Sequence, residues 1–130
     1  MELVKMFVNG QAMSGGSISS GLRNARFLGA ATTAAAYRFY SVRAEFPGLS
    51  WAERGGSSIA GELYEVSYAA LRSELLPLEP PELELSIIEL EDGTGSLSMV
   101  MRTEAIEAEG TVEITEHGGW RAYLAERENA

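Results

Sequence analysis

The 130-residue sequence contains no cysteine, one histidine and one lysine. The absence of cysteine excludes disulfide bonds, thiolate metal sites and cysteine nucleophiles, and it fits a reducing compartment. The single histidine, His117, cannot by itself form a multi-histidine zinc site. The single lysine, Lys5, lies near the N-terminus, which excludes a phosphate-loop or Schiff-base lysine elsewhere in the chain. We therefore expect no bound metal and no cofactor.

Long apolar runs and basic patches are also missing. No segment reaches the roughly 18 apolar residues of a membrane-spanning helix, and residues 1–8 lack the order of a signal peptide. The net charge is −9, and it is uneven: residues 1–61 carry six basic and three acidic residues, residues 62–130 four and sixteen. Nucleic acids and anionic membranes need a basic surface. We expect neither as a partner, and a cytoplasmic protein with an acidic, solvated surface.

The composition is that of a globular protein, with 45% hydrophobic and 22% charged residues, and the length fits one domain spanning residues 1–130. The β-forming residues 3–8 stop at Asn9-Gly10 and predict a central strand. Asp92-Gly93 between two strand patterns predicts a hairpin. Further strands are expected at 25–33 and 36–42, paired with each other, and at 49–52, 58–66, 83–91, 95–102 and 111–114, with a turn at 46–48.

Two helices are expected among these strands. Ser67 is a good N-cap for a helix over residues 68–76, which the following prolines should end. Trp120, Tyr123 and Leu124 share one face of a C-terminal helix that begins near two glycines. Strands dominate and do not alternate regularly with helices. The order predicts an α+β fold, a small mixed β-barrel with flanking helices.

The segment after the first strand, Gly10–Ser17 (GQAMSGGS), is the first candidate site. It has the glycine spacing of a phosphate loop, but Gly16 stands where the lysine is needed, so nucleotide hydrolysis is not expected. A glycine-rich loop after a strand still exposes backbone N–H groups that can bind an anion or a carbonyl oxygen; a flexible turn is the alternative. We expect the N–H groups of Gly10 to Met13 to point into a cavity at the end of the first strand.

Other candidates come from the acidic half. Glu79 and Glu82 stand in a rigid, proline-flanked segment and could exchange protons if desolvated; otherwise they are surface groups. His117 is either a general acid or base or a capping and packing group. Arg121 projects away from Trp120 on the helix, so it either pairs with a glutamate or reaches the pocket as an anion-binding group.

Several strings resemble the γ-glutamylcyclotransferase-like superfamily and, within it, the C-terminal domain of allophanate hydrolases. The string at 114–124 (ITEHGGWRAYL) is the most specific of them. The resemblance extends over residues 6–124. Its other strings are Phe7–Gly10, Ala25–Ala34, Tyr37–Tyr40, Phe46–Leu49, Gly55-Gly56 and Glu89–Gly93.

The resemblance implies a small mixed β-barrel whose first loop closes over a cavity. In cyclotransferases the backbone N–H groups of this loop hold the substrate, and a glutamate after the helix is the acid/base; Glu79 matches its place first and Glu82 second. In the allophanate hydrolase branch a histidine of the loop is implicated in decarboxylating carboxyurea. This sequence departs from both patterns: Asn9 replaces the loop tyrosine, and Ala12 stands where the histidine is expected.

Two functions follow from this reading. In the first, the domain binds a small carboxylate- or amide-bearing nitrogen metabolite through Asn9, Gly10, Gln11, Ala12, Met13 and Arg121. In this role it is an accessory or assembly module that pairs with itself or with an amidase-type hydrolase. In the second, it is an enzyme that uses Glu79 or Glu82 for cyclotransferase-type acyl transfer or carboxyurea-type decarboxylation.

Overall fold

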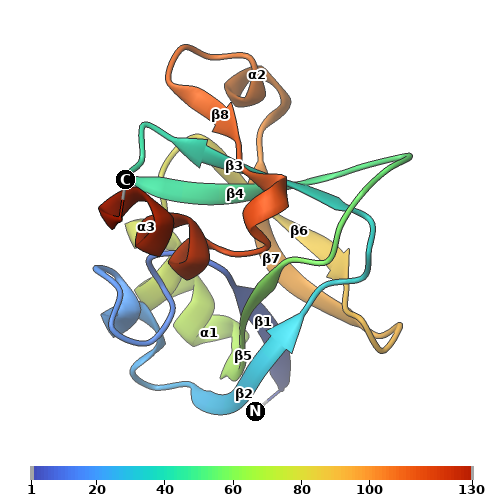
Figure 1. The fold of residues 1–130 in the computed structure, drawn as a ribbon. Helices are drawn as coiled ribbons and strands as arrows, with labels where there is room; N and C mark the ends of the chain where they lie inside the picture. Colours follow the sequence, from blue (N-terminus) through green and yellow to red (C-terminus); the bar gives the residue numbers. More distant parts are fainter. Residues whose placement is uncertain (1, 130) are drawn as a thin grey trace.

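The computed structural model of the protein describes residues 2–129, and Figure 1 shows a curled sheet with short helical segments around it. The strands are β1 (Leu3–Val8), β2 (Arg26–Thr32), β3 (Tyr37–Val42), β4 (Phe46–Trp51), β5 (Ala60–Ser67), β6 (Leu83–Glu89), β7 (Gly95–Met101) and β8 (Thr111–Glu113). The helical segments are η1 (Ser19–Leu22), α1 (Tyr68–Ala70), η2 (Leu71–Leu75), η3 (Leu76–Leu78), α2 (Thr103–Ile106), η4 (Thr115–His117) and α3 (Trp120–Glu128). None of the helices in this range is long and apolar enough to cross a membrane.

The eight strands form one mixed sheet in the order β2-β5-β1-β7-β4-β3-β8, with β6 also paired to β7. β1 is antiparallel to β5 and parallel to β7, so the first strand is central, as the sequence predicts. Because β7 has three neighbours, the sheet branches, and it curls into a half-barrel (Figure 1). The predicted α+β fold, a small mixed β-barrel with flanking helices, is confirmed.

The C-terminal half of β1 is the best-buried part of the sheet. Met6, Phe7 and Val8 are at most 4% exposed. Opposite them on β5, a Cβ added at Gly61 would lie 2.4 Å from the Val8 carbonyl oxygen, so only glycine permits this close approach. Burying a large apolar side chain stabilises the fold by about 1.5–3 kcal/mol. The end of β1, from which the candidate loop departs, is therefore held firmly.

One helical stretch follows β5 and is built from α1, η2 and η3 in succession. The Ser67 hydroxyl accepts a hydrogen bond from the Ala70 N–H at 3.1 Å, so the predicted N-cap is confirmed. Pro77 does not end the stretch, because it occupies the first turn of η3, where no N–H is needed. The backbone becomes extended at Glu79. Glu79 is thus the first residue beyond the helical stretch.

Two predictions about strand pairing and turns are wrong. β2 and β3 both exist, but they do not pair: β2 pairs with β5, and β3 pairs with β4 and β8. The expected turn at residues 46–48 lies inside β4. The chain reverses instead at Arg43 and Ala44, which both have positive φ, with the Glu45 N–H bonded to the Val42 carbonyl. Two non-glycine residues in this conformation are uncommon, so no sequence signal marked the turn.

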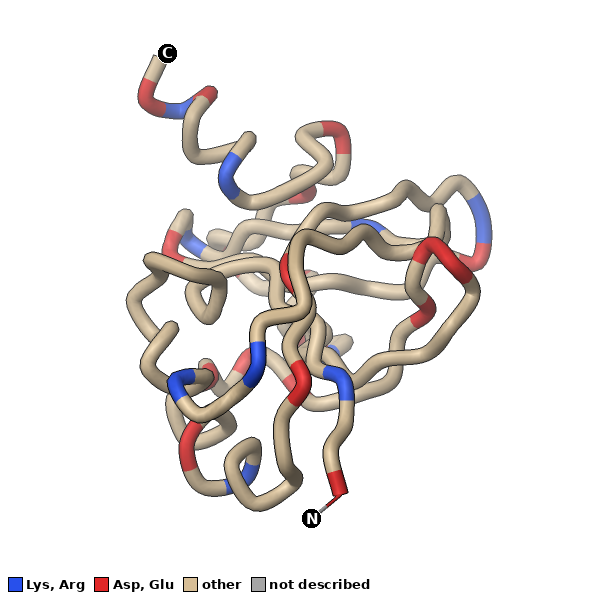
Figure 2. Tube along the Cα trace, turned by 90° about the horizontal axis from the view of Figure 1, so that it is seen from below, with Lys and Arg blue, Asp and Glu red and all other residues tan. Residues whose placement is uncertain are grey.

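Charged residues from the two halves of the sequence pair with each other in the fold. Figure 2 shows basic and acidic residues interspersed along the trace. Arginines of the basic half pair with glutamates of the acidic half. These pairs are Arg23–Glu74, Arg26–Glu65, Arg38–Glu113 and Arg43–Glu82. Because the arginine side chains of these pairs are 42–77% exposed, the pairs contribute little to stability.

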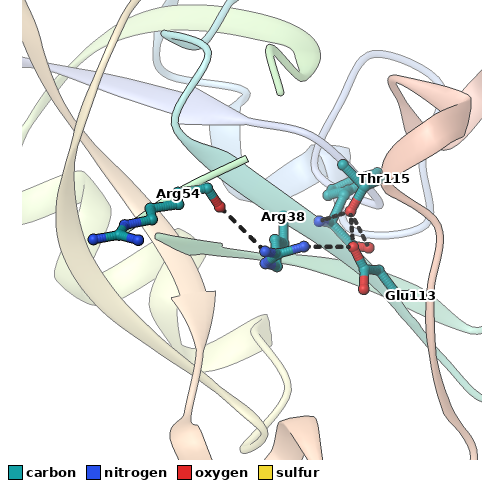
Figure 3. Close-up of polar contacts among 5 residues, drawn as sticks. Arg38, Arg54, Glu113 and Thr115 are labelled. Carbon is teal, nitrogen blue, oxygen red and sulfur yellow. Dashed lines mark hydrogen bonds and ion pairs between the residues drawn. The ribbon is translucent and has the colours of Figure 1, made fainter. Parts of the chain in front are cut away.

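The C-terminal segment is fastened to β3 by the polar cluster in Figure 3. The Thr115 hydroxyl accepts a hydrogen bond from the Phe39 N–H at 2.9 Å and lies 2.8 Å from the Glu113 carboxylate, which pairs with Arg38. α3 then begins at Trp120, directly after Gly119. Trp120 is 3% exposed and packs on the core, so the predicted buried face of the final helix is confirmed.

Candidate functional site

A cavity of about 300 Å³ lies at the C-terminal end of β1. Its lining comes from β1 and the following loop, the start of β4, the end of the helical stretch, and β6 and β7. The lining residues are Phe7, Val8, Asn9, Gly10, Gln11, Ala12, Ser17, Ile18, Glu45, Phe46, Pro47, Leu78, Glu79, Pro80, Leu83, Ser98 and Met99. Most of them are apolar, which is typical of a pocket for a small molecule.

The loop after β1 is folded back on itself. The Met13 N–H bonds to the Gly10 carbonyl and the Ile18 N–H to the Gln11 carbonyl. Gly10 packs so closely on Pro47 that an added Cβ would lie 2.4 Å from the proline ring. Within residues 2–129, the N–H groups of Gly10, Gln11 and Ala12 form no hydrogen bond. These three donors lie on residues that line the cavity.

Glu79 is the acidic group best placed to act in the cavity. Its carboxylate has no ion pair or hydrogen bond to any residue of the described range. Burial alone raises the pKa of Glu79 from its ordinary 4.5 to about 7. Near neutral pH this carboxyl group therefore exists in both protonation states, as a group that donates and accepts protons must.

Two further polar side chains reach the cavity from its buried walls. Asn9 is 8% exposed, and its carboxamide forms no hydrogen bond within the described chain. Ser98 on β7 is fully buried, with only a 3.4 Å contact from its hydroxyl to the Met99 carbonyl. A nearly buried carboxamide without a partner is costly. The polar atoms of Asn9 are not fully buried, so either water or a molecule held in the cavity can pair with them.

Glu62 on β5, which does not line the cavity, holds the loop in place. This carboxylate is 6% exposed and accepts hydrogen bonds from the Ser14 N–H (2.7 Å), the Ser14 hydroxyl (2.8 Å) and the Tyr64 hydroxyl (3.2 Å). Burial raises the pKa of Glu62, but the bonds from Ser14 and the charge of Arg121 outweigh it, and the net pKa is lowered. Glu62 is therefore an ionised anchor for the loop.

Arg121 completes this anchor. Its guanidinium lies 3.4 Å from the Glu62 carboxylate and donates a 2.7 Å hydrogen bond to the Ser14 carbonyl. The contact ties α3 to the loop, and Arg121 does not line the cavity. Of its two expected positions, the structure shows the pairing with a glutamate.

The structure thus brings together most, but not all, of the sequence-predicted residues. Asn9, Gly10, Gln11, Ala12 and Glu79 line one cavity, whereas Met13 is buried in the core beside it. Glu82 is also outside the lining, because it pairs with Arg43 at 3.0 Å. His117 bonds to Glu126 at 2.9 Å and packs edge-on against Tyr123. The chemical roles of the lining residues stay predictions.

Sequence analysis missed Ser98 and Glu62. Glu62, Tyr64 and Val66 are spaced two residues apart on β5. Since side chains two apart lie on the same face of a strand, this spacing places Glu62 on the buried face. That position was a usable signal. No such signal exists in the sequence for Ser98. Its neighbours Leu97 and Met99 are more apolar, so the alternation of the strand predicts that they point inward and that Ser98 points outward.

Comparison with known proteins agrees with this architecture, first at the level of the fold. A solved structure titled gamma-glutamyl cyclotransferase superposes with a TM-score of 0.58 at 14% identity, covering 98% of this chain and 80% of the other. At this identity the likeness concerns the fold alone. The branched, curled sheet is therefore a γ-glutamylcyclotransferase-like fold.

The comparisons also assign the chain to a family that is narrower than this fold. A family model of the allophanate hydrolase C-terminal domain matches residues 4–125, so the chain belongs to this family. Urea amidolyase of Saccharomyces cerevisiae is 32% identical over 106 residues, which are 78% of this chain and 6% of the yeast protein. The chain thus spans only a small part of the curated relatives it matches.

Two solved structures are similar along nearly the whole chain. Kluyveromyces lactis allophanate hydrolase has a TM-score of 0.90 at 28% identity, covering 98% of this chain and 22% of the hydrolase. A protein specific to uropathogenic E. coli has a TM-score of 0.89 at 30% identity, covering 96% of this chain and 98% of its own. The same domain therefore occurs within a long hydrolase and as a chain of about this length.

Proposed function

We propose that the domain binds a small carboxylate- or amide-bearing nitrogen metabolite in the cavity at the end of β1, where Glu79 exchanges a proton with it. The observation that carries the proposal is the partly buried carboxyl group of Glu79, which lines the same cavity as Gly10, Gln11 and Ala12 with their free N–H groups. The N–H groups can hold a carbonyl or carboxylate oxygen. The carboxyl group of Glu79 can exchange a proton with the nitrogen at the other end of the same molecule.

This arrangement also supports catalysis. In a cyclotransferase-type acyl transfer, Glu79 would accept the proton of an attacking amine and return it to the leaving amine. The loop N–H groups would stabilise the negative charge that develops on the carbonyl oxygen. A carboxyurea-type decarboxylation would use Glu79 to protonate the nitrogen as carbon dioxide leaves. Ala12, where the allophanate hydrolase branch is expected to carry a histidine, leaves Glu79 as the titratable group with a shifted pKa in the cavity.

The binding proposal is tested by titrating a set of small carboxylates and amides against ¹⁵N-labelled protein. We expect saturable shifts of the Gly10, Gln11 and Ala12 amide signals. Ala12→Leu puts a larger side chain at a buried position of the lining and should abolish these shifts, with circular dichroism used to check that the variant is folded. Ala122→Leu, on the exposed face of α3, is the matched control and should bind as the parent does. If no compound shifts these signals, or if Ala12→Leu binds normally, the proposal is wrong.

A second candidate function is association with an amidase-type hydrolase. It is favoured by the solved allophanate hydrolase, in which a domain of this family makes up 22% of a longer chain. A separately encoded amidase would then be the partner, and a second copy of this chain is the other candidate. Analytical ultracentrifugation of the domain alone and mixed with such an amidase distinguishes them. A monomer that forms no complex contradicts both.

A further inference from the structure

We infer that the ligand of the cavity is an uncharged amide or urea rather than a carboxylate anion. Its carbonyl oxygen would face the N–H groups of Gly10 to Ala12, and its N–H groups would face Glu79. This inference rests on the proposed binding function and narrows the class of ligand.

The charges of the lining carry the first part of the argument. Among the lining residues that the structure describes, Glu45 and Glu79 are the only ionisable side chains, and both are acidic. The guanidinium of Arg43 lies 5.8 Å from the ring of Phe46, which lines the cavity, but it is already paired with Glu45 and Glu82. Arg121 is paired with Glu62 behind the loop. An anion moved from water into this cavity would gain no free cation to offset its lost hydration.

The hydrogen-bonding groups carry the second part. Three free backbone donors belong to consecutive residues of the loop, Gly10, Gln11 and Ala12, and the carboxylate of Glu79 belongs to another segment. A carboxylate ligand offers acceptors only, whereas a primary amide or urea offers an acceptor at one end and donors at the other. The unpaired carboxamide of Asn9 can donate to and accept from such a molecule. When Glu79 is ionised, only the uncharged ligand can accept from the loop N–H groups and also donate to the Glu79 carboxylate.

Proton linkage gives the two ligand classes opposite pH dependences. A carboxylate can bind beside Glu79 only when that residue is protonated, so its affinity should fall about tenfold per pH unit above the pKa of Glu79. An amide that donates to the Glu79 carboxylate should bind more tightly as the pH rises through the same range. No residue of the described range forms an ion pair with Glu79, and the nearby charged groups Arg43, Glu45 and Glu82 neutralise one another in part.

The test uses three probes of equal size: glutaramide, its monoacid glutaramate, and glutarate. Their dissociation constants are measured from the amide shifts of Gly10, Gln11 and Ala12 at pH 6 and pH 8. We expect glutaramide to bind at least tenfold more tightly than glutarate at pH 8, with a smaller difference at pH 6. Glutarate binding as tightly as glutaramide at pH 8 would overturn the inference and leave the binding function standing. No shift with any probe would overturn both.

A charge variant isolates the cause. Glu79→Gln removes the negative charge, and it should reduce the preference for glutaramide over glutaramate at pH 8 by at least about threefold. Glu84→Gln makes the same change at an exposed residue outside the lining and should keep the parent's preference. An unchanged preference in Glu79→Gln would contradict the assignment of Glu79 to the donor end of the ligand.

Discussion

Replacing Glu79 by glutamine is expected to stabilise the folded protein by about 2 kcal/mol at pH 8, because the ionised carboxylate is unfavourable where it lies. Burial raises the pKa of Glu79 from 4.5 to about 7. Glutamine has the same shape and no charge, so the variant avoids the cost of a desolvated anion. The measurement is the free energy of unfolding in urea, for parent and variant, at pH 4.5, 6 and 8.

The sign of the effect depends on pH in a defined way. Between pH 4.5 and 7 the folded protein retains the Glu79 proton that the unfolded chain has lost, so this residue lowers stability as the pH rises. Below pH 4.5 both states are protonated and the advantage of Glu79→Gln should vanish. The exposed Glu84→Gln should change stability by less than about 0.5 kcal/mol at every pH. A variant less stable than the parent at pH 8 would show that Glu79 is not desolvated.

A stabilising substitution in a cavity has a functional meaning. Residues that act in catalysis or binding are often held in environments that cost stability. Glu79 is placed by the end of a helical stretch, by Pro80 and by apolar neighbours such as Leu78 and Leu83. None of these requires a carboxylate. The fold therefore gives no reason for a carboxylate at this position, which supports the role proposed for Glu79 in the cavity.

Sequence patterns were sufficient for the strands but not for their partners. The alternation and turn signals located β1, the β6–β7 hairpin and α3, because these features depend on neighbours close in the chain. They could not show that β2 pairs with β5 across about thirty residues. The turn at Arg43 and Ala44 was missed because its conformation is imposed by strand pairing and not by the residues themselves.

The candidate site divides in the same way. The glycine-rich loop and Glu79 were found because a loop after a strand and a proline-flanked acid are local features. Glu79 and Glu82 are only three residues apart, but they lie in different surroundings. Glu79 directly follows the helical stretch and lines the cavity, whereas Glu82 pairs with Arg43. The anchor of Glu62, Ser14 and Arg121 joins three distant segments, and no local pattern could assemble it.

The second large effect is expected at that anchor: Glu62→Ala should destabilise the protein by about 2–4 kcal/mol near neutral pH. The substitution removes the acceptor of the Ser14 and Tyr64 hydrogen bonds and the partner of Arg121. Unfolding in urea at pH 7 gives the magnitude. Glu65→Ala is the matched control, since Glu65 lies on the same strand but is paired only loosely, with Arg26 at 3.8 Å, and should cost under about 1 kcal/mol.

The pH dependence of this loss separates it from simple damage to the core. The pKa of Glu62 is lowered in the folded state, so its contribution is present above the ordinary glutamate pKa and is lost as the pH falls through the folded value. The difference between parent and Glu62→Ala should therefore shrink below pH 4.5. The difference at Glu79 also vanishes there, but it has the opposite sign, because Glu62 stabilises the fold when ionised and Glu79 destabilises it. Because Glu62 holds Ser14, the variant should also loosen the loop and broaden the amide signals of Gly10 to Ala12. If the loop signals are unchanged and the loss of unfolding free energy does not depend on pH, Glu62 contributes only through its packing and not as an ionised anchor.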